Sequence, residues 1–201
     1  LTANIAVVNS VDTAVPGTYA VTYNVSDEAE NAAAQVTRMV IVVDTTPPSV
    51  VAQNITVQLD ATGNATITAQ DVDNGSTDAC GIAGLSVSPN AFDCTQVGPN
   101  TVTLTVTDNT GIAASAQAVV TVEDNIVPLA KAKAITIQLD ASGNATITAA
   151  QVDDGSSDAC GIASLSVSPN AFTCENVGTN TVTLTVTDNN SNVSTATASV
   201  T

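Results

Sequence analysis

The segment NTVTLTVTDN stands at residues 100–109 and returns unchanged at residues 180–189, eighty positions later (180 − 100 = 80). Within it, Val102, Leu104 and Val106 alternate with threonines. A period of two places apolar side chains on one face of a β-strand and hydroxyl groups on the other. The segment therefore predicts a strand with one face in a core and the other in water.

The same eighty-residue offset relates longer stretches. ITVQLDATGNATIT at residues 55–68 matches ITIQLDASGNATIT at 135–148, and VDNGSTDACGIAGLSVSPNAF at 72–92 matches VDDGSSDACGIASLSVSPNAF at 152–172. Short apolar runs separated by turn residues are typical of β-sandwiches, and each copy of such a repeat is one folding unit. We predict an all-β chain of tandem Ig-like β-sandwich modules in an elongated array.

The repeats divide the chain into three modules. We expect an Ig-like repeat at residues 48–126 (the middle repeat) and another at 127–201 (the last repeat), joined by VEDNIVPL. Residues 1–46 (the first module) correspond to the C-terminal half of such a module, and VVDTTPPSV follows them. Prolines stiffen both joints. We expect the other half of the first module to lie upstream or to come from a neighbouring chain by strand addition.

Charge and composition exclude several classes of function. Net charge is −16, and the basic residues are Arg38, Lys131 and Lys133, too few to neutralise nucleic-acid phosphates or to attract an anionic membrane. No run reaches the roughly 18 apolar residues of a membrane span, so we expect no direct membrane insertion. Histidine is absent, which excludes Ser-His and Cys-His nucleophiles. We expect no enzyme activity.

Four cysteines form two equally spaced pairs. Cys80 and Cys94 are 14 positions apart, as are Cys160 and Cys174. Zinc sites usually show closer spacing together with histidine. We expect one disulfide within each repeat, Cys80–Cys94 and Cys160–Cys174, and hence an oxidising compartment. The alternative is buried free thiols, since cysteine also packs as a small apolar residue.

Acidic loops also recur, and they contain the candidate ligands of a metal ion. Calcium is held by six to eight oxygens from carboxylates, amides and carbonyls. We expect calcium as a cofactor; the alternative is that Asp, Asn and Gly are simply turn residues. The candidate ligands are Asp71, Asp73, Asn74, Asp78, Asp108 and Asn109, and in the copy Asp153, Asp154, Asp158, Asp188 and Asn189.

Several motifs carry a family resemblance. PGTYAVTYNVSDEAEN at residues 16–31, before VVDTTPP, resembles the second half of a bacterial Ig-like domain, except that Glu30 replaces a glycine of that pattern. DNGSTDACGI, LSVSPNAFDC and NTVTLTVTDN resemble HYR-like and related Ig-like repeats of large secreted surface proteins of Bacteroidetes, such as gliding adhesins of the SprB type. The resemblance implies an extracellular, cell-surface filament or stalk, with a role in adhesion and gliding motility.

The resemblance also implies neighbouring Ig-like modules as partners, and surface glycans or other cell-surface proteins as ligands of the whole protein. Asp12-Thr13-Ala14 and Asp44-Thr45-Thr46 are similar to the O-glycan acceptor pattern of that phylum, so Thr13 and Thr45 are candidate glycosylation sites. Two other hypotheses stay open: a module that itself binds glycan or protein, and an accessory region of a large secreted hydrolase. Two Tyr and two Phe are few aromatic anchors for recognition, which favours the stalk.

Overall fold

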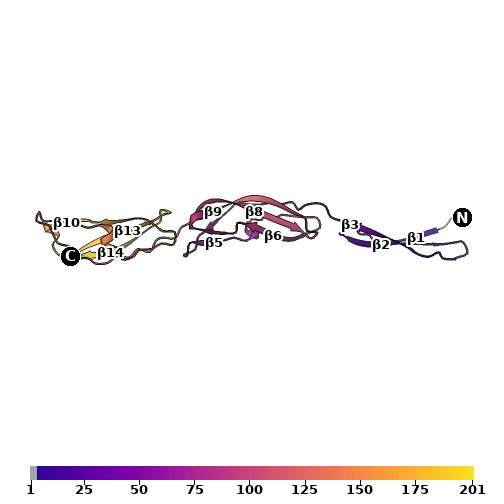
Figure 1. Ribbon diagram of the computed structural model, residues 1–201, viewed down its shortest axis with the longest axis horizontal. Helices are drawn as coiled ribbons and strands as arrows, with labels where there is room; N and C mark the ends of the chain where they lie inside the picture. Colours follow the sequence, from indigo (N-terminus) through magenta and orange to yellow (C-terminus); the bar gives the residue numbers. More distant parts are fainter. Residues whose placement is uncertain (1–3) are drawn as a thin grey trace. The chain divides into compact units, whose positions relative to one another are not determined.

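A computed structural model describes residues 4–201, and the chain is built from β-strands in several sheets (Figure 1). In the first module, β1 (Asn4–Asn9), β2 (Gly17–Ser26) and β3 (Val36–Val42) form an antiparallel sheet in that order. Val21 is the one buried residue within residues 5–42, so this sheet has little core.

The middle repeat has two sheets. The larger has the order β4-β9-β8-β6, with β4 (Ile55–Gln58) parallel to β9 (Ala113–Glu123), and β6 (Ile82–Ser88) antiparallel to β8 (Gly98–Asp108). The smaller pairs β5 (Asn64–Thr66) with β7 (Ala91–Asp93). The predicted strand at residues 101–107 lies within β8.

The last repeat follows the same plan. A three-stranded sheet has the order β11-β13-β14, formed by Ile162–Ser168, Asn180–Asp188 and Val193–Val200, and β10 (Asn144–Thr146) pairs with β12 (Ala171–Thr173). At the place of β4 there is a single parallel bridge, Ile135 to Val200. The fold class predicted from the sequence, all-β with Ig-like β-sandwich repeats, is confirmed.

The helices are short and connect strands. Four-residue helices α1 (Ala69–Val72) and α2 (Ala149–Val152) precede the acidic loops, and the 3-10 turns η1 (Cys94–Gln96) and η2 (Cys174–Asn176) follow β7 and β12. Within residues 4–201, none of the helices has the length and apolar character needed to cross a membrane.

The core lies on the inner face of β8 and of β13. Val182, Leu184 and Val186 are fully buried, and they form one cluster with Ile147, Val152, Phe172 and Val200. Val102, Leu104 and Val106, their counterparts in the middle repeat, are also fully buried. The period-two alternation of the NTVTLTVTDN segment therefore indicates the buried face correctly.

Two compact units divide the chain, and their boundary passes through the middle repeat. One unit contains the chain up to Gln53, Thr68–Ser88 and Val102–Ala118; the other contains Asn54–Ile67, Pro89–Thr101 and Val119–Thr201. Each unit contains one acidic joint, the feature described next.

Candidate functional site

The disulfide of this chain joins two consecutive repeats. Cys94 is bonded to Cys160, with 5.1 Å between their Cα atoms and a sequence separation of 66. Cys80 and Cys174 are free. The pairings Cys80–Cys94 and Cys160–Cys174 predicted from the spacing are therefore wrong.

Strand length explains the correction. Between Cys80 and Cys94 the chain runs through the seven residues of β6, about 20 Å of extended backbone, and returns through only three residues of β7, about 10 Å. A disulfide needs Cα atoms within about 7 Å of each other. Because the path through β6 is longer than the path through β7, the spacing along the chain does not by itself bring the two cysteines of one repeat within this distance. The structure pairs Cys94 with Cys160 instead, so the equal spacing reflects the repeat and not the disulfide pairing.

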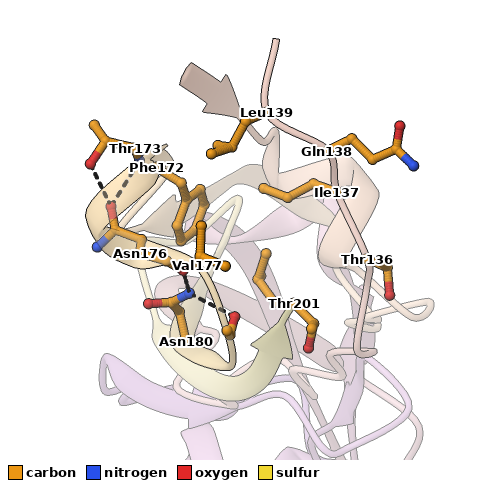
Figure 2. Close-up of a pocket in the computed structure, with 12 residues that line it drawn as sticks. Thr136, Ile137, Gln138, Leu139, Phe172, Thr173, Asn176, Val177, Asn180 and Thr201 are labelled. Carbon is orange, nitrogen blue, oxygen red and sulfur yellow. Dashed lines mark hydrogen bonds between the residues drawn. The ribbon is translucent and has the colours of Figure 1, made fainter. Parts of the chain in front are cut away.

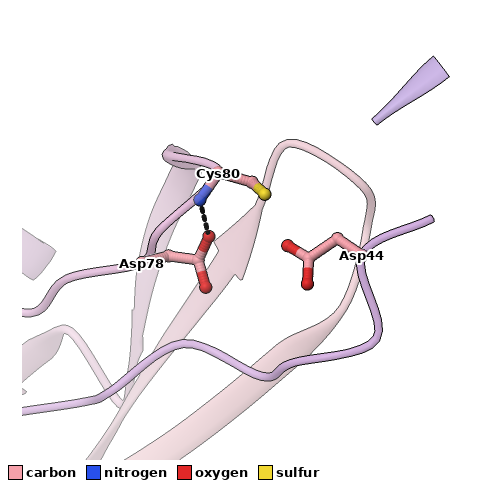
Figure 3. A group of neighbouring side chains, drawn as sticks. All are labelled: Asp44, Asp78 and Cys80. Atoms are coloured by element: carbon pink, nitrogen blue, oxygen red, sulfur yellow. Dashed lines mark hydrogen bonds between the residues drawn. The ribbon is translucent and has the colours of Figure 1, made fainter. Parts of the chain in front are cut away.

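The first acidic joint is formed by Asp44, Asp78, Cys80 and Asp108. One carboxylate oxygen each from Asp44 and Asp78 and the Sγ atom of Cys80 lie within 4.8 Å of one another (Figure 3). Asp44 follows β3, whereas Asp78 and Cys80 lie in the loop between α1 and β6. At this joint, the beginning of the linker that follows the first module lies against the acidic loop of the middle repeat.

Each carboxylate of this joint is anchored through one oxygen. The Oδ1 atom of Asp44 accepts a hydrogen bond from the Thr46 N–H (2.9 Å), and Asp78 Oδ1 accepts one from the Cys80 N–H (2.7 Å). Asp44 Oδ2 is buried and has no hydrogen-bond partner. The turns thus fix the carboxylates and leave an oxygen of Asp44 available.

Asp108 repeats this arrangement at the end of β8. Its side chain is 1% exposed, and its Oδ1 atom accepts hydrogen bonds from the N–H groups of Thr110 and Ile112, both at 2.8 Å. Burial opposes ionisation of Asp108, but these N–H groups outweigh it and lower the pKa of the carboxyl group. Its Oδ2 atom is buried without a partner.

The negative charge of the joint acts on the thiol. The Asp44 carboxylate raises the pKa of Cys80, and burial and the charges of Asp78 and Asp108 add to this effect. Cys80 is therefore held as a thiol, which is a poor nucleophile. Asp108 is placed at this joint by strand pairing, because it lies opposite Ile82, two residues after Cys80, where β8 pairs with β6.

Asn109 packs the end of β8 against the acidic loop. Its Nδ2 atom donates to the Cys80 carbonyl (2.8 Å), and its N–H donates to the Gly81 carbonyl (3.1 Å). Gly81 has φ +92°, and a Cβ atom there would lie 2.7 Å from Asn109 Nδ2. The positive φ, together with this close approach, favours glycine in the ACGI motif.

The second acidic joint consists of Asp124, Asp158, Cys160 and Asp188. The first three again place ligand-type atoms within 4.8 Å of one another. Asp124 is 6% exposed; its Oδ1 atom accepts from the Ile126 N–H (3.0 Å), and its Oδ2 atom is buried without a partner. Asp158 Oδ1 accepts from the Cys160 N–H (2.7 Å).

Asn192 distinguishes the second joint from the first. Its Nδ2 atom donates to the Asp124 carbonyl (3.0 Å) and to Asp188 Oδ2 (2.9 Å). The matching residue of the middle repeat is Ile112 (192 − 80 = 112), which has no such group. Asn189 keeps the contact of its counterpart, because its Nδ2 atom donates to the Cys160 carbonyl (2.7 Å).

Other residues predicted as ligands are engaged elsewhere. Asp71 closes a capping box at α1, where its Oδ2 atom accepts from the Thr68 N–H (2.6 Å). Gln151 makes the same contact with Thr148 (2.8 Å), which explains why a neutral residue replaces the acid in the copy.

The remaining predicted ligands stay within their own turns. Asp73 accepts from the Ser76 N–H (3.1 Å), and Asp153 accepts from the Ser156 N–H (3.1 Å). Exposed in the same loops are Asn74 and Asp154, and the candidate glycosylation residues Thr13 and Thr45 are exposed as well. The structure thus brings Asp78, Asp108 and Asn109, and their copies, to the joints.

Sequence reasoning missed Asp44 and Asp124. Both follow the last strand of a module, both precede the joint prolines, and they are 80 positions apart (124 − 44 = 80), the offset of the repeat. That common offset was the available signal. The joint between modules therefore contributes residues to the site and is not only a spacer.

An apolar pocket of about 390 Å³ lies in the last repeat (Figure 2). Ile137, Leu139, Phe172, Val177 and Val200 supply most of its apolar lining, with hydroxyl and amide side chains between them. No titratable side chain lines it, so it offers no acid, base or charged anchor. In the middle repeat, the equivalent of Leu139 is Leu59, whose N–H donates to the Glu123 carbonyl of β9 (2.9 Å) and whose side chain is 2% exposed.

A family model matches the first part of the chain. Residues 1–42 match the family model described as "Bacterial surface protein, Ig-like domain". A search of curated proteins finds no match.

Among solved structures, the chain is similar to three cadherin fragments. Human CDH23 EC21-23 is 15% identical with a TM-score of 0.45, over 92% of this chain and 74% of that one. Protocadherin Gamma B7 domains 1-4 are 13% identical with a TM-score of 0.40, over 92% and 57%. Drosophila N-cadherin EC1-4 is 13% identical with a TM-score of 0.36, over 100% and 66%. This chain thus spans little more than half of the protocadherin fragment.

Proposed function

We propose that this chain is a section of the stalk of a secreted bacterial cell-surface adhesin, in which the repeats have a structural, non-catalytic role. The Cys94–Cys160 disulfide carries the proposal, because a covalent bond between consecutive repeats resists force applied along the chain. The match of residues 1–42 to a bacterial surface Ig-like domain supports an extracellular location. Gliding motility, implied by the resemblance to gliding adhesins, is part of the proposal.

Residue chemistry favours a stalk over a ligand-binding tip. The pocket of the last repeat lacks charged groups, and the chain contains four aromatic residues (2 + 2 = 4), the usual anchors of glycan and protein recognition. The clustered carboxylates at the joints accept hydrogen bonds from backbone N–H groups, and there they serve the connection between modules.

Single-molecule stretching of the 201-residue chain tests the proposal. The disulfide excludes the segment between Cys94 and Cys160, a sequence separation of 66, from extension, so the unfolding length should rise by about 230 Å when the bond is reduced. Cys94→Ser should show the longer extension with and without reductant, and Cys80→Ser should behave as the unmodified chain. Equal extension before and after reduction would remove the main support for a stalk that carries mechanical force.

A glycan array and a pull-down with cell-surface proteins complete the test. A stalk section should show no saturable binding in either assay. Saturable micromolar binding by the isolated chain would instead make these repeats a recognition module, and the stalk proposal would fail.

A further inference from the structure

We propose that the two acidic joints are calcium sites, the first built by Asp44, Asp78 and Asp108 and the second by Asp124, Asp158 and Asp188. The inference goes beyond the stalk function and does not depend on it, since a cation can bind these carboxylates in any protein that contains the joints. The ligands predicted from the sequence all lay within one repeat. The proposed sites add the aspartate that ends the preceding module, Asp44 at the first joint and Asp124 at the second.

Buried oxygens without partners are the first argument. The great majority of buried polar atoms in folded proteins are hydrogen-bonded, and an unpaired buried charge is strongly unfavourable. Yet Oδ2 atoms of Asp44 and Asp108 at the first joint, and of Asp124 at the second, are buried and have none. Asp108 is 1% exposed and Asp124 is 6% exposed, so bulk water does not solvate these groups.

Preorganisation is the second argument. Asp44, Asp78, Asp108 and Asp124 each give Oδ1 to a backbone N–H of their own turn, and a second oxygen remains. Asp44 and Asp78 place their carboxylate oxygens within 4.8 Å of each other. Like charges held this close repel, and a cation between them converts that repulsion into attraction. The turns therefore hold an arrangement that a bound cation would stabilise.

Donor chemistry selects calcium. What the two joints share is oxygen, because Cys160 at the second joint is in the disulfide and has no thiolate to offer. Zinc prefers sulfur and nitrogen ligands, whereas oxygen donors suit calcium and magnesium. Calcium accepts six to eight oxygens in a flexible geometry, and magnesium requires a near-ideal octahedron. Carboxylates from three separate segments, completed by water, fit calcium better.

The two sites should differ in affinity. At the second joint, Asn192 already donates to Asp188 Oδ2, so a cation must compete with a hydrogen bond for that oxygen. At the first joint, Ile112 leaves the equivalent oxygen of Asp108 without a partner. We therefore expect the first joint to bind calcium more tightly than the second.

Calorimetric titration of the 201-residue chain with calcium chloride, after treatment with EDTA, tests the inference. We expect two sites, with the tighter one weakened at least tenfold by Asp44→Asn and the weaker one at least tenfold by Asp124→Asn. Asp73→Asn and Asp153→Asn are matched controls, since they remove the same charge from residues outside the clusters, and they should leave both affinities within about twofold. Far-ultraviolet circular dichroism confirms that each variant is folded.

Ile112→Asn provides a variant without a change of charge. Its amide should pair with Asp108 Oδ2 and weaken the first site alone. The inference is overturned by any of three outcomes: no heat up to about 10 mM calcium, equal loss in the joint variants and the controls, or saturable binding of zinc but not calcium. Failure here would leave the stretching result on the disulfide unaffected.

Discussion

Asn192 donates a side-chain hydrogen bond to the main-chain carbonyl of Asp124 over 3.0 Å, although 68 residues separate them. The contact ties the turn after β13 to the segment that leads into the last repeat. A second hydrogen bond from the same amide, to Asp188, fixes the direction of the side chain. The second joint is therefore built both from the residues that lead into the last repeat and from the turn after β13 within it.

Removing this amide should destabilise the last repeat. Asn192→Ile loses two hydrogen bonds, one of them to a carboxylate, and leaves buried Asp188 Oδ2 without a partner; we expect a loss of about 2 kcal/mol. Urea unfolding in EDTA measures it. Asn74→Ile changes an exposed residue and should alter stability by less than about 0.5 kcal/mol. Equal effects of the two variants would contradict the prediction.

Peptide mapping should find one disulfide, Cys94–Cys160, and alkylation of the native chain should label Cys174, the exposed thiol. In the chain-entropy model, a loop of this length stabilises by about 4 kcal/mol, so Cys94→Ser should lose roughly that amount in unfolding experiments under oxidising conditions. Cys174→Ser is the control and should leave stability nearly unchanged. A peptide containing Cys80 linked to Cys94 would show that the pairing described here is incorrect.

Truncating the buried face of β13 should be costly. Leu184 is fully buried in the core of the last repeat, so Leu184→Ala should lose about 2–5 kcal/mol through lost burial and the cavity it leaves. Val177 is 79% exposed, and Val177→Ala should change stability by less than about 0.5 kcal/mol. Chemical denaturation of both variants in parallel decides whether this strand face holds the core together.

Glu30 occupies a backbone conformation that favours glycine. Its φ is +63°, in the left-handed region, and its N–H donates to the Asp27 carbonyl in a turn. A side chain in this region costs the folded state roughly 1 kcal/mol. Glycine avoids that cost, but it also raises the conformational entropy of the unfolded chain, which cancels part of the gain in stability. Glu30→Gly should therefore stabilise the first module by less than about 1 kcal/mol, measured by urea unfolding, whereas Glu30→Val should destabilise it. Stabilisation by valine would refute the assignment.

Acid should destabilise the chain through turn carboxylates. The Ser76 hydroxyl, which donates to Asp73, lowers the pKa of that carboxyl below its ordinary value of 3.8, and Ser156 does the same for Asp153. Because the folded pKa is depressed, this stabilisation is fully present above the unfolded value and is lost as pH falls through the folded one. The urea midpoint should be constant above about pH 5 and should fall below about pH 4.

Serine variants check the cause. Ser76→Ala with Ser156→Ala should flatten the acid slope, because the carboxyl groups of Asp73 and Asp153 then titrate closer to 3.8 in the folded state. Ser86→Ala, at an exposed site on β6, is the control and should keep the slope. A slope that the double variant leaves unchanged would mean that other groups cause the acid sensitivity.

Local pattern determined what the sequence could predict. The alternation of Val102, Leu104 and Val106 with threonine identified a strand and its buried face, because both depend on neighbours along the chain. The partner of Cys94 depends instead on which ends of two repeats meet, and equal spacing contains no information about that. Asp44 was missed because its place beside Asp78 follows from the folded joint, although its 80-residue offset from Asp124 marked it as part of the repeat.

The disulfide joins unlike cysteines of two consecutive repeats. The second cysteine of the middle repeat bonds to the first cysteine of the last repeat, whereas the first module contains no cysteine to meet Cys80. The disulfide therefore holds together the two repeats that meet at the second joint, and the first joint has no such bond. In a reducing medium the second joint would lose its bond and the first would lose nothing, so a redox change would remove the covalent difference between the two connections.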